Sequence, residues 1–252
     1  MYPVLFTVFG FEISTFGVML VVGFLVAGWL YARAFAELGY DPEDAKDLLV
    51  WSGVGGILGS KLWFVAESVV RTGVPLTSVL FSRGGLTWYG GLVLGTAAVV
   101  IAARRKRVPL RVATQFAAPC VAVGQFFGRI GCFLVGDDYG GPTDLPWGVA
   151  FPDGIDPIST PVHPTMLYEA AWLLAITGIL WLRRTRSPFL FGEYLMLASL
   201  GRFFVEELRL NPAFIAGLTN AQVTAVVLAL IGATGWLLLS RRWTPLPRAA
   251  AS

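Results

Sequence analysis

An arginine stands among glycines near the middle of a very apolar chain, and two adjacent acids follow it. Arg129 lies in the run Gly-Arg-Ile-Gly-Cys, and the acids are Asp137 and Asp138. A guanidinium in apolar surroundings is costly, so it is kept where it faces a polar cavity, a carboxylate or a phosphate. The stretch therefore indicates an anion-binding site. The alternative is that Arg129 extends its charge to a membrane surface and the two acids lie in a solvated turn.

Five glycines flank Arg129 and the acids. A residue without a side chain lets the backbone approach a ligand closely and turns N–H groups toward an anion. We therefore expect a bound headgroup to lie against these positions, which are Gly128, Gly131, Gly136, Gly140 and Gly141.

Three charged residues toward the C-terminal end of the chain share one face of a predicted helix. Arg202, Glu206 and Arg209 are spaced at i, i+4 and i+7, which places them along one side of a helix. One interpretation is an ion pair within the membrane that orients two helices. The other is a second phosphate-binding arginine that Glu206 holds in place. Spacing alone does not choose between them.

The chain has one histidine, and it directly precedes a proline. His163-Pro164 opens an apolar stretch, and proline in the first turn is a helix start signal. This predicts that His163 lies at the outer membrane surface. It would act there as a helix cap or hydrogen-bond donor, or it would exchange protons near neutral pH.

A glycine-rich aromatic segment, Arg83-Gly-Gly-Leu-Thr-Trp-Tyr-Gly-Gly91, begins another apolar stretch. Its aromatic pair, Trp88 and Tyr89, is typical of the aromatic belt at a membrane interface. The doubled glycines on both sides also permit a turn or a close approach to a ligand.

Composition fixes the class of protein that presents these residues. The 252 residues are 56% hydrophobic and 14% charged, and the mean hydropathy is +0.68. Such values indicate an integral membrane protein. The two cysteines, Cys120 and Cys132, form no CxxC motif and have no cluster of histidines near them, so we expect no disulfide framework and no zinc site. Basic residues are dispersed, which argues against nucleic-acid binding.

Seven apolar stretches are long enough to cross a bilayer as helices, which takes roughly 20 residues each. They predict an all-α membrane protein with one transmembrane domain over residues 1–252. The stretches are 14–31, 48–66, 86–103, 112–128, 165–182, 189–206 and 218–239. Three GxxxG spacings predict close helix contacts, at Gly55/Gly59, Gly91/Gly95 and Gly124/Gly128.

Most of the 19 Lys and Arg residues follow the first, third, fifth and seventh stretches. The positive-inside rule then predicts that the N-terminus is outside, the C-terminus is cytoplasmic, and the region around 129–163 lies on the outer side. Lys61, Arg129 and Arg202 are not needed for this topology. Since they lie inside or beside apolar stretches, they call for polar partners.

Four segments, in order, resemble the prolipoprotein diacylglyceryl transferase family of bacterial inner membranes. The segments are Gly84-Gly-Leu-Thr-Trp-Tyr-Gly-Gly-Leu92, Gly128-Arg-Ile-Gly-Cys-Phe133 with Gly136-Asp137, His163-Pro-Thr-Met-Leu-Tyr-Glu169, and Gly201-Arg-Phe-Phe-Val-Glu206.

The resemblance implies an enzyme at the outer leaflet of the cytoplasmic membrane. It would transfer the diacylglyceryl group of phosphatidylglycerol to the lipobox cysteine thiol of a prolipoprotein signal peptide and release glycerol phosphate, without metal or cofactor. The implied catalytic residues are Arg129, Arg202, Glu206, Asp137 and Tyr89. The expected substrate-binding residues are Arg129, Arg202, Gly131, Cys132, Gly140, His163 and Lys61.

Several positions depart from the family pattern. Tyr89 stands where the family has a histidine, Cys132 where it has an asparagine and Asp137 where it has a glutamate, while Phe16 and Ala198 replace tyrosines. Tyrosine, with a reference pKa of about 10, is a poor base at neutral pH. The acceptor of the thiol proton therefore stays open among Asp137, His163 and the departing phosphate.

Two alternatives remain from the sequence. One is a related lipid-dependent transferase with a different acceptor, in which Cys132 serves as a transient nucleophile. The other is a non-catalytic phospholipid-binding membrane protein, in which Arg129 and Arg202 only hold a headgroup.

Overall fold

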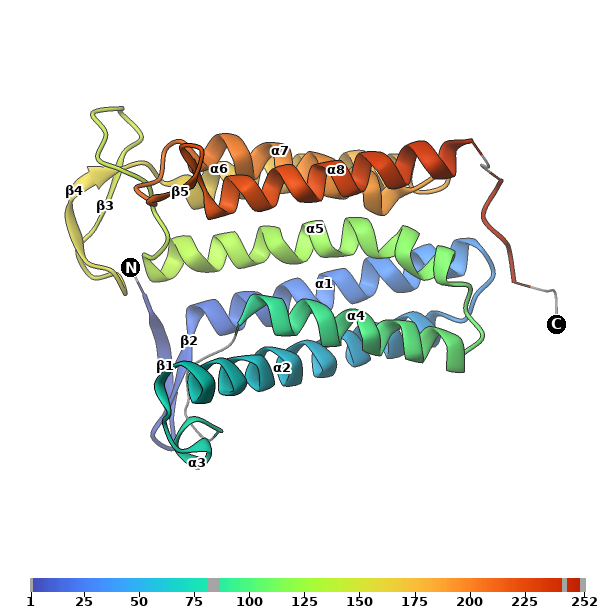
Figure 1. Ribbon diagram of the computed structural model, residues 1–252, viewed down its shortest axis with the longest axis horizontal. Helices are drawn as coiled ribbons and strands as arrows, with labels where there is room; N and C mark the ends of the chain where they lie inside the picture. The colour runs from blue at the N-terminus through green and yellow to red at the C-terminus, as the bar shows by residue number, and fades with distance from the viewer. Residues whose placement is uncertain (1, 81–86, 242–243, 250–252) are drawn as a thin grey trace. The chain divides into compact units, whose positions relative to one another are not determined.

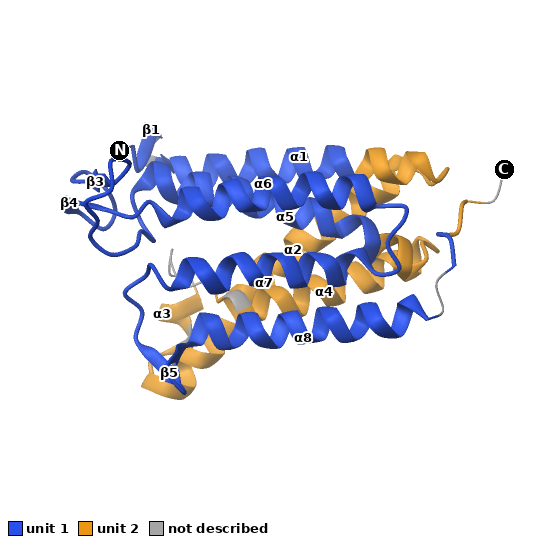
Figure 2. Ribbon diagram, turned by 90° about the horizontal axis from the view of Figure 1, so that it is seen from above, with its two compact units in different colours: residues 1–30, 114–246 blue, residues 31–113, 247–252 orange. Residues whose placement is uncertain are grey.

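The computed structural model describes residues 2–80, 87–241 and 244–249. The chain divides into two compact units (Figure 2). Unit 1 comprises residues 1–30 and 114–246, and unit 2 comprises residues 31–113 and 247–252. The prediction of a single domain stays a prediction.

Unit 1 consists of long helices with short hairpins (Figure 1). Its helices are most of α1 (Thr15–Glu37) and of α5 (Leu110–Val135), together with α6 (Thr165–Arg183), α7 (Leu190–Glu206) and α8 (Asn220–Ser240). Its antiparallel hairpins are β1 (Val4–Val8) with β2 (Phe11–Ser14), β3 (Val149–Phe151) with β4 (Ile158–Val162), and β5 (Ala213–Ile215) with β6 (Leu218–Thr219). In both ribbon views, β3, β4 and β5 lie at the same end of unit 1.

Unit 2 is built on two helices that pack along each other, α2 (Pro42–Thr72) and α4 (Trp88–Arg105), with the short α3 (Leu76–Leu80) between them in the chain. Glycines make the approach of α2 and α4 possible. A Cβ atom added at Gly59 would lie 2.2 Å from the carbonyl oxygen of Gly90, and one added at Gly55 would lie 2.7 Å from the Cβ of Ala98. The GxxxG prediction is therefore confirmed for these helices.

The third GxxxG prediction is wrong in detail. A Cβ atom added at Gly124 would meet no atom within 4 Å, and one at Gly128 would only touch Leu20. The glycines that let α1 and α5 approach are instead Gly23 and Gly131, where an added Cβ would lie 2.9 Å from Phe127 and from Phe16 respectively. Helix packing depends on which face carries the glycine, and the spacing of four residues does not specify that face.

Helices lie over all seven predicted ranges, although their ends differ. Within the described residues, five of them are long and apolar enough to cross a membrane, namely α1, α2, α5, α6 and α8. The clearest difference is α5, which was expected to end at Gly128 and continues to Val135. Gly131 lies within this helix and packs against Phe16 of α1. The helix ends at Gly136, whose φ of 73° favours glycine. The loop that follows the helix carrying Arg129 therefore begins at residue 136 rather than at residue 129.

The all-α prediction missed the three hairpins. Two of them turn at a residue followed by glycine with both φ angles positive, Phe9-Gly10 and Ala216-Gly217, as tight hairpins require. Their strands are two to five residues long, too short for an alternating pattern to register.

Two apolar clusters hold unit 1 together. Ala118, Ala122, Ile176, Leu180 and Leu190 join the start of α5, the end of α6 and the start of α7. At the hairpin end, buried Phe151, Val162 and Met166 fix β3 and β4 to the start of α6, and the Tyr139 ring stacks on Phe151 at 5.4 Å. The loop that follows α5 is thereby anchored beside α6.

Candidate functional site

Three helices of unit 1 bring two arginines and two glutamates together. Glu169 on α6 lies between Arg129 on α5 and Arg202 on α7: its Oε2 pairs with Arg129 Nε, and its Oε1 accepts a 2.5 Å hydrogen bond from Arg202 Nη1. Arg202 Nη2 also pairs with Glu206 Oε2 at 2.9 Å, one turn along α7. The two arginines are thus joined by one carboxylate that uses both of its oxygens.

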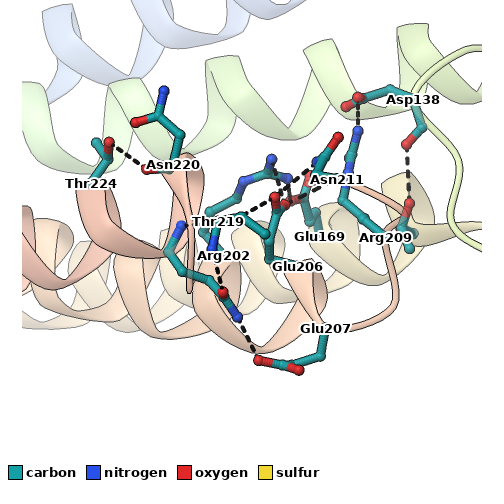
Figure 3. A network of polar contacts seen from close by, with 12 residues as sticks. Asp138, Glu169, Arg202, Glu206, Glu207, Arg209, Asn211, Thr219, Asn220 and Thr224 are labelled. Carbon is teal, nitrogen blue, oxygen red and sulfur yellow. Dashed lines mark hydrogen bonds and ion pairs between the residues drawn. The ribbon is translucent and has the colours of Figure 1, made fainter. Parts of the chain in front are cut away.

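Arg209 and Asp138 close this network into a ring, and Figure 3 shows the pair that these two residues form. Arg209 Nε lies 3.7 Å from Glu206 Oε2, and its Nη2 pairs with Asp138 Oδ1. Asp138 Oδ2 in turn pairs with Arg129 Nη1. The ion-pair ring, defined as Arg129, Asp138, Arg209, Glu206, Arg202 and Glu169, alternates in charge at every step. With three guanidiniums and three carboxylates ionised, it carries no net charge.

Backbone hydrogen bonds between the chain segments that follow α5, precede α6 and follow α7 hold the ring in place. Gly140 N–H donates to the carbonyl of His163 at 2.9 Å, and Gly141 N–H donates to the carbonyl of Leu208 at 2.8 Å. Thr165 Oγ1, at the start of α6, donates to the carbonyl of Asp138 at 3.1 Å. Local contacts therefore position Asp138 and Arg209 at the ends of the helices that carry the other members.

The ring has a buried side and an accessible side. The side chains of Glu206, Glu169 and Arg209 are 0%, 6% and 8% exposed, whereas those of Arg129, Arg202 and Asp138 are 26%, 28% and 34% exposed. An anion from outside therefore meets Arg129, Arg202 and Asp138 first, with Glu169 behind the two arginines.

Glu206, the most buried member, has polar partners beyond the ring. Its Oε1 accepts hydrogen bonds from Asn211 Nδ2 at 2.8 Å and from Thr219 Oγ1 at 2.9 Å (Figure 3). Thr219 also caps α8 in a reciprocal arrangement with Gln222. A buried carboxylate is retained where its lone pairs are filled and a cation is close. Hairpin β5–β6 therefore keeps Glu206 oriented toward Arg202.

The structure brings three of the predicted residues together: Arg129, Arg202 and Glu206. It places Asp138 in the ring, whereas Asp137, which the sequence had favoured, lies beside it. Asp137 Oδ1 is buried and has no hydrogen-bond partner among the described residues. Burial raises the pKa of Asp137 above its usual range, against the opposing influence of Cys132 and Arg129.

The other predicted positions near Arg129 have packing or backbone contacts. Gly131 lies inside α5 and packs against Phe16. The N–H of Gly140 donates to the carbonyl of His163, so it is not turned toward an anion as expected. Cys132 is half-buried, one turn after Arg129 on α5. The Nδ1 of His163 lies 3.4 Å from the hydroxyl of Tyr168, which accepts a 2.7 Å hydrogen bond from Trp147.

Two predicted residues belong to unit 2. Lys61 lies on α2 with its Nζ 5.5 Å from the centre of the Phe64 ring. Tyr89 lies in the first turn of α4 and is 50% exposed. The first four residues of that glycine-rich motif, Arg83 to Leu86, lie outside the described residues.

Sequence reasoning did not assign three members of the ring to the site. Glu169 was visible only as the last residue of the His163 segment, Arg209 only as the i+7 neighbour of Arg202, and Asp138 only as one of two adjacent acids. The sequence did contain a signal for them, because in an apolar chain each acidic side chain needs a cation as its partner and each cation needs an acid.

The chemistry that this arrangement supports is the binding of an anion. Guanidinium groups bind phosphate oxygens in paired, charge-assisted hydrogen bonds, and Arg129 and Arg202 present two of them at the accessible side. Among the described residues, no group of three or more His, Cys, Asp or Glu side chains is arranged to hold a metal ion.

Comparison with known proteins gives a consistent set of relatives. A family model described as prolipoprotein diacylglyceryl transferase matches residues 3–238. Three similar proteins carry the name phosphatidylglycerol–prolipoprotein diacylglyceryl transferase. That of Synechococcus elongatus is 32% identical, covering 96% of this chain and 90% of the relative. That of Clostridium tetani is 33% identical, covering 92% and 95%. That of Rhizobium leguminosarum bv. trifolii is 34% identical, covering 82% and 78%.

Proposed function

Because the chain belongs to the prolipoprotein diacylglyceryl transferase family, we propose that it transfers the diacylglyceryl group of phosphatidylglycerol to the lipobox cysteine of a prolipoprotein. The observation that carries this proposal is the pair of accessible arginines, Arg129 and Arg202, which the single carboxylate of Glu169 bridges. Two guanidiniums held side by side suit a phosphodiester, whose two free oxygens share one negative charge.

The reaction exchanges one bond to the glycerol carbon for another. The cysteine sulfur forms a C–S bond with the terminal glycerol carbon of the diacylglyceryl group, while the bond from that carbon to the phosphate oxygen breaks. Glycerol phosphate leaves with the electron pair of the broken bond, and the thiol proton passes to a base or to the leaving phosphate. Negative charge on the phosphate grows as the C–O bond breaks, so Arg129 and Arg202 stabilise the transition state more than the bound lipid.

The two glutamates act as positioning residues in this mechanism. Glu169 fixes the separation of the arginines from behind, and Glu206 orients Arg202 from the same helix. Neither glutamate faces outward as a base, since both are almost fully buried and paired with guanidiniums.

Asp137 is our candidate for the proton acceptor. Its carboxylate is not part of the ring, and one oxygen has no partner among the described residues. Burial also raises the pKa of Asp137, which makes the carboxylate a stronger base. His163 and the leaving phosphate remain competitors. The role predicted for Tyr89 stays a prediction.

The membrane placement is part of the same proposal. We place all seven long helices across the cytoplasmic membrane, with the N-terminus outside and the C-terminus in the cytoplasm. The positive-inside distribution supports this, because α4 and α6 both end in basic turns, with Arg104 and Arg105 on α4 and Arg183 on α6. The ion-pair ring would then lie toward the outer leaflet, where prolipoproteins emerge.

A reconstituted assay tests the proposal. Purified protein in detergent is mixed with phosphatidylglycerol and a lipobox peptide, and both glycerol phosphate release and peptide mass are followed. We expect one diacylglyceryl group per modified peptide, and a loss of activity in Arg129→Gln and Arg202→Gln. Arg71→Gln serves as the matched control, because Arg71 forms an exposed pair with Glu67 on α2.

The outcomes separate the alternatives that the sequence left open. Normal turnover in both ring variants would refute the proposed site. Lipid bound by folded protein without any product would favour a non-catalytic phospholipid-binding protein. Glycerol phosphate released without peptide modification would point to a different acceptor, and loss of that release in Cys132→Asn would implicate the cysteine as a nucleophile.

A further inference from the structure

Arg209 is the most deeply buried cation of the ion-pair ring, yet it is the least satisfied one. Its side chain is 8% exposed, and its Nε and Nη1 have no hydrogen-bond partner among the described residues. Burial lowers the pKa of Arg209 to about 10, and the nearby charge of Arg129 adds to this effect. A buried guanidinium with unused donors beside a second guanidinium is suited to an additional anion.

Asp138 occupies the position between these two cations. One carboxylate oxygen pairs with Arg129 and the other with Arg209, and the two non-bridging oxygens of a phosphate can make the same pair of contacts. Asp138 is also the most exposed member of the ring. It lies two residues after Gly136, where α5 ends, and its own φ is 61°. Aspartate tolerates this backbone conformation better than most residues.

Charge favours a one-for-one exchange. The complete ring is neutral, so removing the carboxylate of Asp138 leaves one net positive charge. A phosphodiester with one negative charge neutralises it. The other two carboxylates are poor candidates for exchange. Glu169 is 6% exposed between two arginines, and Glu206 is fully buried and held by Asn211 and Thr219.

We propose that Arg209 is a third phosphate-binding arginine of this site, and that the carboxylate of Asp138 occupies the phosphate position until a phosphate-bearing ligand displaces it. The proposal rests on the function given above for the identity of the ligands. These are a lipid phosphodiester on entry and a phosphate monoester on exit, two sources of the same chemistry. The monoester gains a second negative charge near neutral pH, and the returning carboxylate of Asp138 competes with it for Arg129 and Arg209.

Binding measurements on the full chain test the exchange. Purified protein in detergent is titrated separately with a short-chain phosphatidylglycerol and with glycerol phosphate, by calorimetry. We expect Asp138→Asn to bind phosphate ligands about tenfold more tightly, since the internal competitor is gone, and Arg209→Gln to bind them about tenfold more weakly. Asp144→Asn removes an exposed carboxylate from the same loop region and is expected to match the wild type.

Unchanged affinity in Arg209→Gln would overturn the role of Arg209, and unchanged or weaker affinity in Asp138→Asn would overturn the exchange. Should Asp138→Asn fail to fold, infrared difference spectra of wild-type protein with 13C-labelled aspartate give the answer without a substitution. Adding glycerol phosphate is expected to shift an aspartate carboxylate band that is still present in Asp137→Asn. No shift would overturn the proposal.

The two ligand arms identify which source the site favours: tighter binding of the lipid assigns it to the substrate, and tighter binding of glycerol phosphate to the product. These binding readouts need no transfer, so a failure of the exchange can be distinguished from a failure of the proposed function. A protein that binds both ligands as described but never modifies the peptide would refute the transferase and leave the exchange intact. Transfer together with unaltered binding in both variants would refute the exchange and leave the transferase intact.

Discussion

Glu169 on α6 accepts a 2.5 Å hydrogen bond from Arg202 on α7, and this pair fixes the two helices to each other beside the accessible side of the ion-pair ring. The other oxygen of the same carboxylate pairs with Arg129 on α5. One side chain therefore sets the spacing of two cations that come from different helices. Its removal is expected to affect both folding and catalysis.

Glu169→Gln is expected to lower the free energy of unfolding by about 3 kcal/mol, because it leaves two partly buried guanidiniums without their shared carboxylate. Reversible unfolding in SDS measures this loss. Glu67→Gln, which breaks an exposed pair on α2, is expected to cost less than about 1 kcal/mol. In the transfer assay, Glu169→Asp should recover part of the activity, mainly through the KM for lipid. Equal stability of Glu169→Gln and Glu67→Gln would contradict the bridging role.

Asp137→Asn is expected to raise the thermal unfolding midpoint at neutral pH. The pKa of Asp137 is higher in the folded chain than in the unfolded one, with burial as the main cause. Its contribution to stability is therefore fully present below the unfolded pKa, and it is lost as the pH rises through the raised folded pKa. The permanently neutral asparagine avoids that loss.

The advantage of Asp137→Asn should disappear as the pH falls to about 4, near the reference pKa of aspartate. Asp144→Asn provides the control, since Asp144 is exposed and no pH-dependent difference is expected there. The same Asp137→Asn protein should transfer more slowly if Asp137 accepts the thiol proton. A lower midpoint than the wild type at neutral pH would count against the burial of this carboxylate as a cost to stability.

Gly59→Ala is expected to destabilise the packing of α2 against α4 by about 1–3 kcal/mol, the usual range for an overpacked contact. The added methyl would lie 2.2 Å from the carbonyl oxygen of Gly90, a backbone atom that can move only if the helices separate. Gly56→Ala is a matched control on the same helix, since its methyl would lie 4.0 Å from the nearest atom, the carbonyl oxygen of Gly91. Similar unfolding midpoints for the two variants would show that the close approach of α2 and α4 contributes little.

Thr219→Ala removes both the cap of α8 and a hydrogen bond to the buried carboxylate of Glu206. Loss of the cap alone typically costs about 1 kcal/mol, and the unfilled lone pair of Glu206 adds to that cost. Thr224→Ala is the control, because the Thr224 hydroxyl donates to the carbonyl of Asn220 within α8. We expect slower transfer for Thr219→Ala, since Glu206 orients Arg202, and normal transfer for Thr224→Ala.

Much of the candidate site could be predicted from the sequence because charge is conspicuous in an apolar chain. Arg129, Arg202 and Glu206 were identified from residue type and spacing, and the structure places all three in one ring. Two of the three GxxxG spacings correctly indicated where α2 and α4 approach. The apolar stretches located the helices, because a helix that crosses a bilayer must be apolar over many residues.

The sequence by itself determined that these charges needed partners, while only the tertiary structure decided which partners they have. Asp138 rather than Asp137 enters the ring because α5 continues to Val135 and Gly136 then turns the chain, which sets the direction of each following side chain. Glu169 joins Arg129 to Arg202 because α6 packs beside α5 and α7. Local propensity fixes where a helix begins and ends, whereas the pairing of charges from three helices depends on contacts between residues that lie far apart in the chain.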